Sequence, residues 1–330
     1  MAGRKISLRR WVNEYNFSFR KFQNIKRLVR LKKQKGIKIS VCIPTLNEEK
    51  TVGRIIHIIK SYLMQRYPLV DEILVIDSGS TDNTKKVAKK AGAKFYTADR
   101  YLPKYGKYYH KGENLWKALY LAKGDIIVYV DADIRNFHAR FVYGLVGPLL
   151  EDDKIGYVKA YYKRPIIINE QYIPQGGGRT TWIVVKPMFN LFFPQLVGFI
   201  QPLSGEYAGR RKVLERVPFS TGYGVETGLL IDIYKKFGFG VMAQVDMLKR
   251  EHRNQTITAL ARQSFAILQT FFKKISEHGY LKLKEEYRDK FSYITRTGKL
   301  RDIKTFHIEE IERPPMIEIP EYLNKFRIRN

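Results

Sequence analysis

The amino-acid sequence predicts an α/β fold built on a Rossmann-like, doubly wound and mostly parallel sheet. From residue 37 onward, short β-rich segments alternate with helical ones, a pattern typical of parallel strands joined by right-handed crossovers. Polar segments at 44–49, 77–82 and 131–133 each follow an apolar strand. The carboxyl ends of parallel strands meet at one edge of a sheet, where such folds bind ligands, so we expect these three segments to lie together.

The individual elements follow from hydrophobic periodicity and from turn residues. In the first half we expect strands at 37–43, 72–76, 94–96 and 125–130 and helices at 48–64, 81–91 and 113–122. In the second half we expect extended segments at 157–163, 203–210 and 241–245, helices at 180–193, 225–237 and 256–275, and a Gly-rich loop at 175–179. The tail beyond residue 279 is charged and interrupted by prolines, which favours a peripheral wrap over a further domain.

Positive charge is concentrated at the N-terminus. The chain has 60 Lys and Arg against 32 Asp and Glu, a formal net charge of +28, and residues 1–36 carry twelve of the basic residues with one acid, Glu14. Such a field attracts polyanions, including nucleic acid, membrane surfaces and phosphorylated metabolites. The sequence shows no zinc-finger spacing, RNA-binding aromatic signature or basic leucine-zipper heptads, so we expect no nucleic-acid partner.

A helix is expected within this basic extension, between residues 16 and 33. Its apolar positions approximate one face: Phe19, Phe22, Ile25, Leu28, Val29 and Leu31. Such a face packs against the body of the protein or against a second subunit, and we expect a homodimer. The alternative is an arm that binds a membrane surface or nucleic acid.

Neither a disulfide nor a membrane span is expected. The single cysteine, Cys42, lies in an apolar run and is typical of a small buried residue. The N-terminus is charged, unlike a secretory signal. The apolar stretch 182–200 is interrupted by Lys186, Pro187 and Pro194, which favours a buried helix ending near Pro194 over a transmembrane one. These features indicate a cytoplasmic protein without integral membrane association.

Asp131-Ala132-Asp133 follows the apolar segment 125–130. Two carboxylates at positions i and i+2 beyond a strand end can converge on one hard divalent cation, which neutralises a departing diphosphate. An isolated Asp-x-Asp is common in surface loops, so the prediction depends on its place beside two other strand-end segments. We therefore expect a divalent-metal site at this edge.

The other two strand-end segments have capping interpretations beside functional ones. Ser80 or Thr81 is expected to cap the helix that follows 77–82, and Asn47 can cap the helix that follows 44–49. The functional interpretation is that both segments face a nucleotide base or ribose. No Gly-rich phosphate loop of the Rossmann or Walker type follows the first strand, which argues against a dinucleotide enzyme or an NTPase.

Five further motifs follow in order along the chain. They are Lys111-Gly112-Glu113-Asn114-Leu115-Trp116, Gly176-Gly177-Gly178-Arg179, Pro202-Leu203-Ser204-Gly205-Glu206-Tyr207-Ala208, Gly222-Tyr223-Gly224-Val225-Glu226 and His252-Arg253-Asn254. Together with the three strand-end segments, this series resembles the glucosyl-3-phosphoglycerate synthases, which are retaining glycosyltransferases of the GT-A fold. The match covers residues 41–272, and the ordered set is specific.

The resemblance implies a metal-dependent enzyme that moves glucose from a nucleoside-diphosphate donor, UDP-glucose first of all, to D-3-phosphoglycerate. The product is glucosyl-3-phosphoglycerate, a precursor of glucosylglycerate, and the cofactor is Mg²⁺, or alternatively Mn²⁺ or Co²⁺. Residues 37–155 are then the nucleotide-sugar-binding half and residues 156–278 the acceptor-binding half of one catalytic domain. Residues 1–36 form a basic extension and residues 279–330 a peripheral segment, both outside the match.

The resemblance also implies roles for individual positions. Donor binding falls to Pro44, Thr45, Leu46, Glu48, Ser78, Lys111, Asp131 and Ala132; metal binding to Asp133 and His252; acceptor binding to Gly178, Arg179, Thr181, Tyr223, Arg250 and Asn254. Leu203 and Glu226 border the transferred sugar and complete the catalytic set with Asp133. Family members commonly carry Ala where this chain has Thr45, a change that a backbone contact tolerates.

Some of these roles also follow from residue chemistry. Arg179 after glycines can present a planar fork to a phosphate or carboxylate, although a solvated turn would look the same. His252 stands among basic and polar neighbours, so it is either a metal ligand or part of a surface basic loop. Glu226 begins an apolar helix, where an acid either stabilises the N-terminus or faces a sugar.

The resemblance favours front-face attack by the acceptor hydroxyl, assisted by the leaving phosphate, with Glu226 as an alternative covalent nucleophile. The nearest alternative function is mannosyl transfer from GDP-mannose to the same acceptor. A polyprenyl-phosphate sugar transferase is a more distant one, supported only by the basic extension and the 182–200 stretch. A non-catalytic nucleic-acid binder is the alternative from another class.

Overall fold

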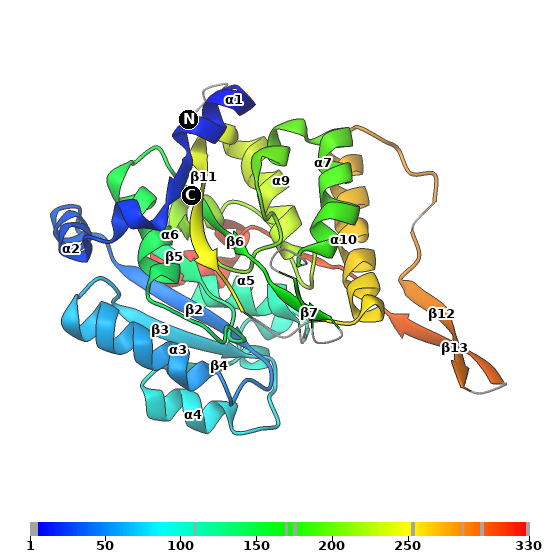
Figure 1. The fold of residues 1–330 in the computed structure, drawn as a ribbon, viewed down its shortest axis with the longest axis horizontal. Coiled ribbons are helices and arrows are strands. Elements are labelled where there is room, and N and C mark those ends of the chain that lie inside the picture. Colours follow the sequence, from blue (N-terminus) through cyan, green and yellow to red (C-terminus); the bar gives the residue numbers. More distant parts are fainter. Residues whose placement is uncertain are drawn as a thin grey trace.

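The computed structural model describes residues 6–108, 110–168, 171–173, 177–251, 255–285, 287–297 and 300–327. An eight-stranded sheet forms its centre, with the strand order β1-β11-β6-β9-β5-β2-β3-β4 (Figure 1). Its strands are β1 (Asn16–Ser18), β2 (Ile39–Thr45), β3 (Glu72–Asp77), β4 (Lys94–Thr97), β5 (Ile126–Tyr129), β6 (Tyr157–Lys163), β9 (Tyr207–Arg210) and β11 (Met242–Lys249). Neighbours are parallel except at β9, which is antiparallel to both β5 and β6. The mostly parallel sheet is as predicted.

Helices cover both faces of the sheet. The helices on one face are α2 (Ile25–Gln34), α3 (Val52–Ile58), α4 (Thr84–Ala91) and α6 (Arg140–Glu151), which share one hydrophobic core. The helices on the other face are α5 (Lys111–Leu121), α7 (Lys186–Phe192), α9 (Val225–Phe237), α10 (Ile257–Glu277) and α11 (Pro320–Phe326), which share a second core. Alternate residues of β5 enter the two cores, so the whole strand is apolar and buried.

The N-terminal extension is part of this fold. A short helix, α1 (Leu8–Glu14), precedes β1, which pairs in parallel with β11 and forms the edge of the sheet. The expected single helix over 16–33 is therefore wrong at its start, because residues 16–18 are recruited as a strand and residues 19–22 form a 3₁₀ turn. The expected apolar face is buried on the body through Phe22, Ile25 and Leu28.

Most predicted elements of the body are present. The bounds of β6 and α9 are those expected, and the helix expected at 48–64 starts later, at Val52, and continues as π-helical turns over Ile59–Arg66. Helix α6 lies where no element was expected, and it contains Gly144, Gly147 and Pro148. Its packing explains the glycines: a Cβ on Gly147 would lie 2.2 Å from the ring of Phe22, so this face must be bare for the extension to dock.

The apolar stretch 182–200 is broken into short helical pieces. These are a π-helical segment at Thr181–Val185, α7 and a 3₁₀ helix at Pro194–Gly198. The helix ends before Pro194 as expected, but it is not fully buried, since Trp182, Ile183 and Leu191 are exposed. Among the residues that the structure describes, no helix is long and apolar enough to cross a membrane.

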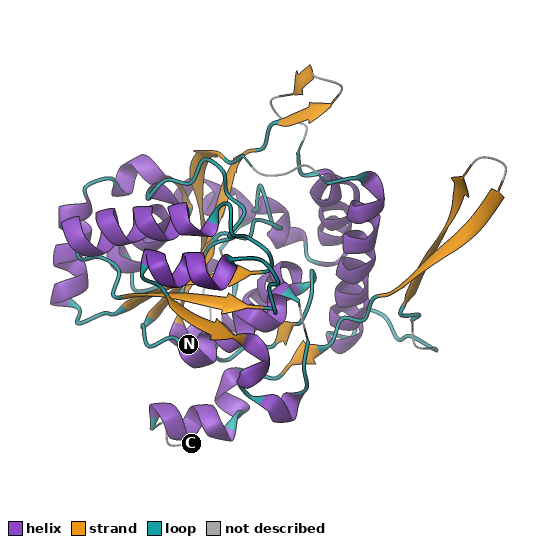
Figure 2. Ribbon diagram, turned by 90° about the horizontal axis from the view of Figure 1, so that it is seen from below, coloured by secondary structure: helices purple, strands orange, loops and turns teal. Residues whose placement is uncertain are grey.

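The tail beyond residue 279 leaves the body and returns to it. An antiparallel hairpin of β12 (Lys290–Thr297) and β13 (Leu300–His307) extends away from the body in both views (Figures 1 and 2). A second small hairpin is formed by β7 (Ile166–Ile168) and β8 (Gln171–Ile173). After β13, the C-terminal segment returns to the body, where β14 (Glu312–Arg313) pairs with β10 (Phe219–Ser220) and α11 packs into the second core. A further short helix of the body is α8 (Arg211–Leu214).

The packing of the extension predicts a large stability effect from one residue. Trp11 is fully buried, stacks on Phe239 at 4.3 Å between ring centroids, and donates its indole N–H to the carbonyl of Met242 over 2.7 Å. Trp11→Ala should lower the free energy of unfolding by about 3–5 kcal/mol in chemical denaturation. Val12→Ala, at an adjacent exposed position, should change it by less than about 0.5 kcal/mol. A loss below about 1 kcal/mol for Trp11→Ala would show that the extension is only loosely attached.

Candidate active site

A cavity of about 440 Å³ opens at the carboxyl edge of the sheet. Its wall is formed where β2, β3, β5, β6 and β11 end and where α5 and α9 begin. Because β9 runs antiparallel, it brings its start rather than its end to this edge, which places Leu203 in the same wall. The three strand-end segments predicted to lie together therefore do meet.

The cavity brings together all the predicted site residues that the structure describes. They are Pro44, Thr45, Leu46, Glu48, Ser78, Lys111, Asp131, Ala132, Asp133, Gly178, Arg179, Thr181, Leu203, Tyr223, Glu226 and Arg250. Two predicted residues, His252 and Asn254, lie outside the described part of the chain. The individual roles of these residues remain predictions.

Sequence reasoning missed several residues that line the same cavity. They are His110, Asn114, Arg164, Gly177, Thr180, Gly222, Gln255, Leu260, Gln263 and Ile267. Asn114, Gly177 and Gly222 stand inside motifs already singled out. Arg164 directly follows β6, so the strand-end argument could have found it, whereas Leu260, Gln263 and Ile267 share one face of α10 that only the tertiary packing turns toward the cavity.

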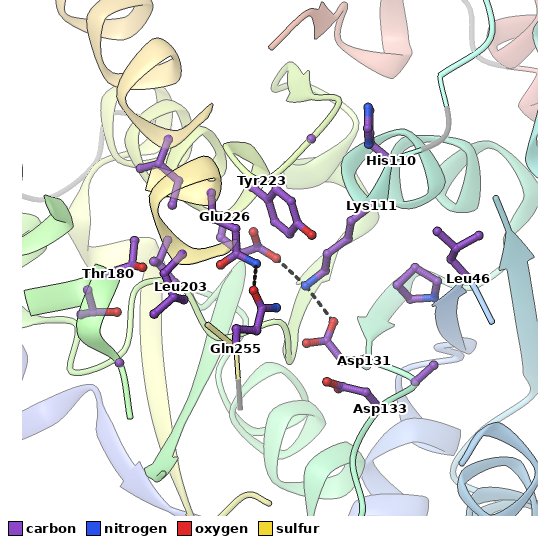
Figure 3. A pocket seen from close by; sticks show the side chains of 18 of the residues that line it. Leu46, His110, Lys111, Asp131, Asp133, Thr180, Leu203, Tyr223, Glu226 and Gln255 are labelled. Atoms are coloured by element: carbon purple, nitrogen blue, oxygen red, sulfur yellow. Dashed lines mark hydrogen bonds and ion pairs between the residues drawn. The ribbon is translucent and has the colours of Figure 1, made fainter. Parts of the chain in front are cut away.

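Lys111 joins the two halves of the cavity electrostatically. Its ammonium group lies 2.7 Å from Asp131 Oδ1 and 2.8 Å from Glu226 Oε1, so the end of β5 and the start of α9 meet at the first residue of α5 (Figure 3). Burial alone would lower the pKa of Lys111, but these two carboxylates outweigh it and raise the pKa. Lys111 is therefore firmly cationic at the centre of the site.

Arg250 supplies a second buried cation. Its Nη2 contacts Asp131 Oδ2 at 3.0 Å and Asp133 Oδ1 at 2.7 Å, while its Nε lies 3.3 Å from Glu206. Burial alone would raise the pKa of Asp131, but Lys111 and Arg250 hold it well below its usual range. The pKa of Glu206, by contrast, is raised by burial.

A glycine makes this approach of charges possible. A Cβ on Gly205 would lie 2.1 Å from Asp131 Oδ2, so any larger residue would displace that carboxylate. Beside it, Tyr162 donates its hydroxyl to Glu206 Oε2 over 2.6 Å. The Pro202–Ala208 motif thus acts partly by leaving room for the Asp131 side chain.

The residues present fit a divalent cation. The two carboxylates of Asp131 and Asp133 reach one guanidinium nitrogen, so they are placed to share one positive centre, and oxygen ligands suit Mg²⁺ or Mn²⁺. Burial raises the pKa of Glu48, and the carboxylates of Asp133 and Asp131 add to the rise, which indicates excess negative potential at this corner. No cluster of three or more His, Cys, Asp or Glu in the described ranges is arranged as a metal site, and the predicted third participant, His252, lies outside them.

The loops at 44–49 and 77–82, which follow β2 and β3, are hydrogen-bonded to each other. Asp77 accepts from Thr45 Oγ1 at 2.8 Å and from the Ser80 backbone N–H at 2.8 Å, and Asn47 Oδ1 accepts from the Thr81 N–H at 2.9 Å. The predicted capping roles of Ser80, Thr81 and Asn47 are therefore wrong. The start of α4 is held instead by Asp82 Oδ1 and Glu49 Oε2, since the helix begins later than expected, at Thr84.

The opposite wall holds the predicted acceptor-binding residues. Arg179 is half-buried and donates from Nη2 to the carbonyl of Gln255 over 2.8 Å, which orients its guanidinium along the cavity wall. Thr181 is buried, whereas Tyr223 is 48% exposed, and its side chain lies beside Lys111 and Glu226 in Figure 3. This wall offers a cation, hydroxyl groups and an accessible aromatic ring.

The sequence of residues 40–217 matches the family model described as glycosyl transferase family 2. Over 311 residues the chain is 52% identical to the glucosyl-3-phosphoglycerate synthase of Petrotoga mobilis, covering 94% of this chain and 96% of that protein. The chain belongs to the glucosyl-3-phosphoglycerate synthase family.

Solved structures of related enzymes share the fold of this synthase family member. The mannosyl-3-phosphoglycerate synthase of Rubrobacter xylanophilus superposes with a TM-score of 0.86 at 36% identity, covering 96% of this chain and 99% of that one. The glucosyl-3-phosphoglycerate synthase of Mycobacterium tuberculosis in complex with Mn²⁺, UDP-glucose and phosphoglyceric acid gives 0.76 at 36% identity, covering 89% and 95%. The predicted GT-A-type sheet is confirmed.

The buried charges of the site predict a stability effect for this family member. Arg250 is 3% exposed and faces three acids, so Arg250→Met should cost about 3–5 kcal/mol of unfolding free energy because the carboxylates lose their buried counter-ion. The neighbouring control, Lys249→Met, removes an exposed ion pair with Glu251 and should cost about 1 kcal/mol or less. Equal unfolding midpoints for the two variants would contradict this account.

Proposed function

We propose that this chain transfers glucose from UDP-glucose to D-3-phosphoglycerate, with retention at the anomeric carbon, giving glucosyl-3-phosphoglycerate. The proposal depends chiefly on one observation: the predicted donor, metal and acceptor positions that the structure describes line one cavity at the carboxyl edge of the sheet. It is supported by the 52% identity to the Petrotoga mobilis synthase over 94% of this chain.

The donor is assigned to the first half of the cavity. The ends of β2 and β3, with Pro44, Thr45, Leu46 and Ser78, are proposed to hold the uridine. Lys111 is proposed to turn its ammonium group from Asp131 and Glu226 toward the donor diphosphate, because phosphate oxygens compete for the same cation. Residues 37–155 are on this proposal the nucleotide-sugar half of the catalytic domain.

The metal is assigned to Asp133 and His252, and Asp131 is assigned to the region of the ribose and the metal. When bound there, a divalent cation supplies positive charge to the diphosphate as the sugar leaves. Arg250, which now pairs with both aspartates, is proposed to keep them aligned and to face the acceptor as well.

The acceptor is assigned to the second half, residues 156–278. Arg179 is proposed to bind the phosphate or carboxylate of phosphoglycerate as a fork, with Gly178 allowing close approach of the backbone and Thr181 and Tyr223 donating hydroxyl groups. Asn254 is proposed to join them. Residues 1–36 and 279–330 are proposed to support this domain from outside.

Retention is proposed to follow front-face attack of the acceptor hydroxyl. Glu226 is 4% exposed, and its carboxylate lies 2.8 Å from the ammonium group of Lys111. This carboxylate is proposed to accept hydrogen bonds from hydroxyl groups of the sugar, while Leu203 borders the sugar from the other side. A trapped glycosyl adduct on Glu226 would instead make this residue the nucleophile of a two-step reaction.

The decisive experiment is a panel of donors. The protein is incubated with 3-phosphoglycerate, Mg²⁺ and UDP-glucose, ADP-glucose, GDP-glucose or GDP-mannose, and the products are detected by mass. Glucosyl-phosphoglycerate formed best from UDP-glucose is expected. Faster product formation from GDP-mannose would favour the mannosyl reaction of the Rubrobacter xylanophilus relative, and no product from any donor would reject both. The homodimer and the cytoplasmic location stay predictions.

Asp133→Ala should abolish metal-dependent turnover without unfolding the protein. The Asp133 side chain is 38% exposed, so loss of its pair with Arg250 should cost only about 1 kcal/mol. Turnover is measured with EDTA, without EDTA and after Mg²⁺ is restored. The control is Asp302→Ala, which replaces an exposed acid on β13. Full activity of Asp133→Ala in chelator-free buffer would reject the metal assignment.

Arg179→Ala should chiefly weaken acceptor binding. Loss of a charge-assisted hydrogen bond costs about 1.5–3 kcal/mol, so the KM for phosphoglycerate should rise roughly ten- to hundred-fold while the KM for UDP-glucose stays near its original value. Arg216→Ala, at an exposed position that does not line the cavity, is the matched control. An unchanged acceptor KM would count against the role of Arg179.

A further inference from the structure

The C-terminal segment holds a loop of the cavity through one carboxylate. Glu310 lies between β13 and β14, and its Oε2 accepts from the backbone N–H of Gly222 at 3.0 Å while its Oε1 accepts from that of Gly224 at 3.2 Å. Two backbone donors in front of α9, which the helix itself cannot satisfy, thus share one acceptor.

The glycines of this loop are required by that contact. A Cβ on Gly222 would lie 2.2 Å from Glu310 Oε1, and a Cβ on Gly224 would lie 1.8 Å from Thr270 Oγ1 of α10. Larger side chains at either position would push the carboxylate or the helix away. The Gly-Tyr-Gly sequence therefore allows Glu310 and α10 to close on the loop from two sides.

Glu310 is itself held in place. Its backbone N–H donates to Gln269 Oε1 over 3.1 Å, and Gln269 Nε2 donates to the carbonyl of Ile308 over 2.8 Å. Gln269 is buried on α10, the helix whose other turns line the cavity. The carboxylate is therefore presented from a fixed backbone rather than from a free tail.

The residues after Glu310 tie the same loop to α5. Strand β14 pairs with β10, and the Thr221 N–H donates to the carbonyl of Ile311 over 2.8 Å. Arg313 then reaches the buried Glu113 of α5, with 2.6 Å between Nε and Oε2. One short segment thus holds the starts of α5 and α9, the helices that carry Lys111 and Glu226.

We propose that Glu310 is a positioning residue for the acceptor: by fixing the 222–224 loop, it sets where Tyr223 and Glu226 stand against the acceptor and the sugar. Glu310 does not line the cavity, so it acts through the loop and not by touching substrate. The donor loops at the ends of β2 and β3 are not attached to it. This inference rests on the proposed function.

The test compares Glu310→Gln with Glu309→Gln, a change at the adjacent exposed glutamate. Gln has one acceptor oxygen and turns an NH₂ group toward the backbone donors, so at least one N–H of the loop loses its partner. Glu310→Gln should raise the KM for phosphoglycerate or lower kcat about ten-fold or more, because small displacements of positioning groups have large rate effects. The Kd for UDP with Mg²⁺ should stay within about two-fold of wild type.

A second pair of variants addresses the same contact. Gly222→Ala should reproduce the kinetic loss, and its effect should shrink in the Glu310→Ala background, where the clashing carboxylate is gone, because residues in contact do not act additively.

The inference would be overturned if Glu310→Gln left the acceptor kinetics unchanged. It would also be overturned if this variant lost UDP binding and acceptor binding equally and had a lower Tm. Wild-type turnover of UDP-glucose and phosphoglycerate is measured in the same series. If the wild type forms no product, it is the proposed function that fails; if it does and Glu310→Gln matches it, only the positioning role fails.

Discussion

The site depends on the neutralisation of acidic side chains that different parts of the chain bring to one place. Asp131 comes from the end of β5, Glu226 from the start of α9, and the ammonium group of Lys111 lies within 2.8 Å of both. Such charges are costly to bury without partners, so their neutralisation requires close and fixed geometry. Strand β5 and helices α5 and α9 hold this geometry, in which both carboxylates pair with the ammonium group of Lys111.

The order of strands makes that meeting possible. Inserting one antiparallel strand, β9, between β5 and β6 brings the start of a strand to an edge otherwise made of strand ends. Gly205, just before this strand, leaves the space that the Asp131 carboxylate occupies. A uniformly parallel sheet would place another strand end at that position.

The two ends of the chain both pack on the catalytic domain. The basic extension adds strand β1 and helix α2 to the first core, and Lys32, Lys35 and Arg27 pair with acids of the body, so part of its charge is neutralised within the fold. The C-terminal segment returns through β14 to the second core and reaches α5 through Arg313. Both segments are integral to the domain although they flank the matched motifs.

The sequence by itself determined the alternation of strands and helices, the strand-end position of Asp131 and Asp133, and many of the residues that share one cavity. These follow from local periodicity and from motifs, which are written along the chain. Only the tertiary structure decided that residues 16–18 join the sheet, that Gly147 makes room for Phe22, and that Asn47 fastens two loops instead of capping a helix. Each of these depends on contacts between residues distant in sequence, and such contacts leave no local pattern to read.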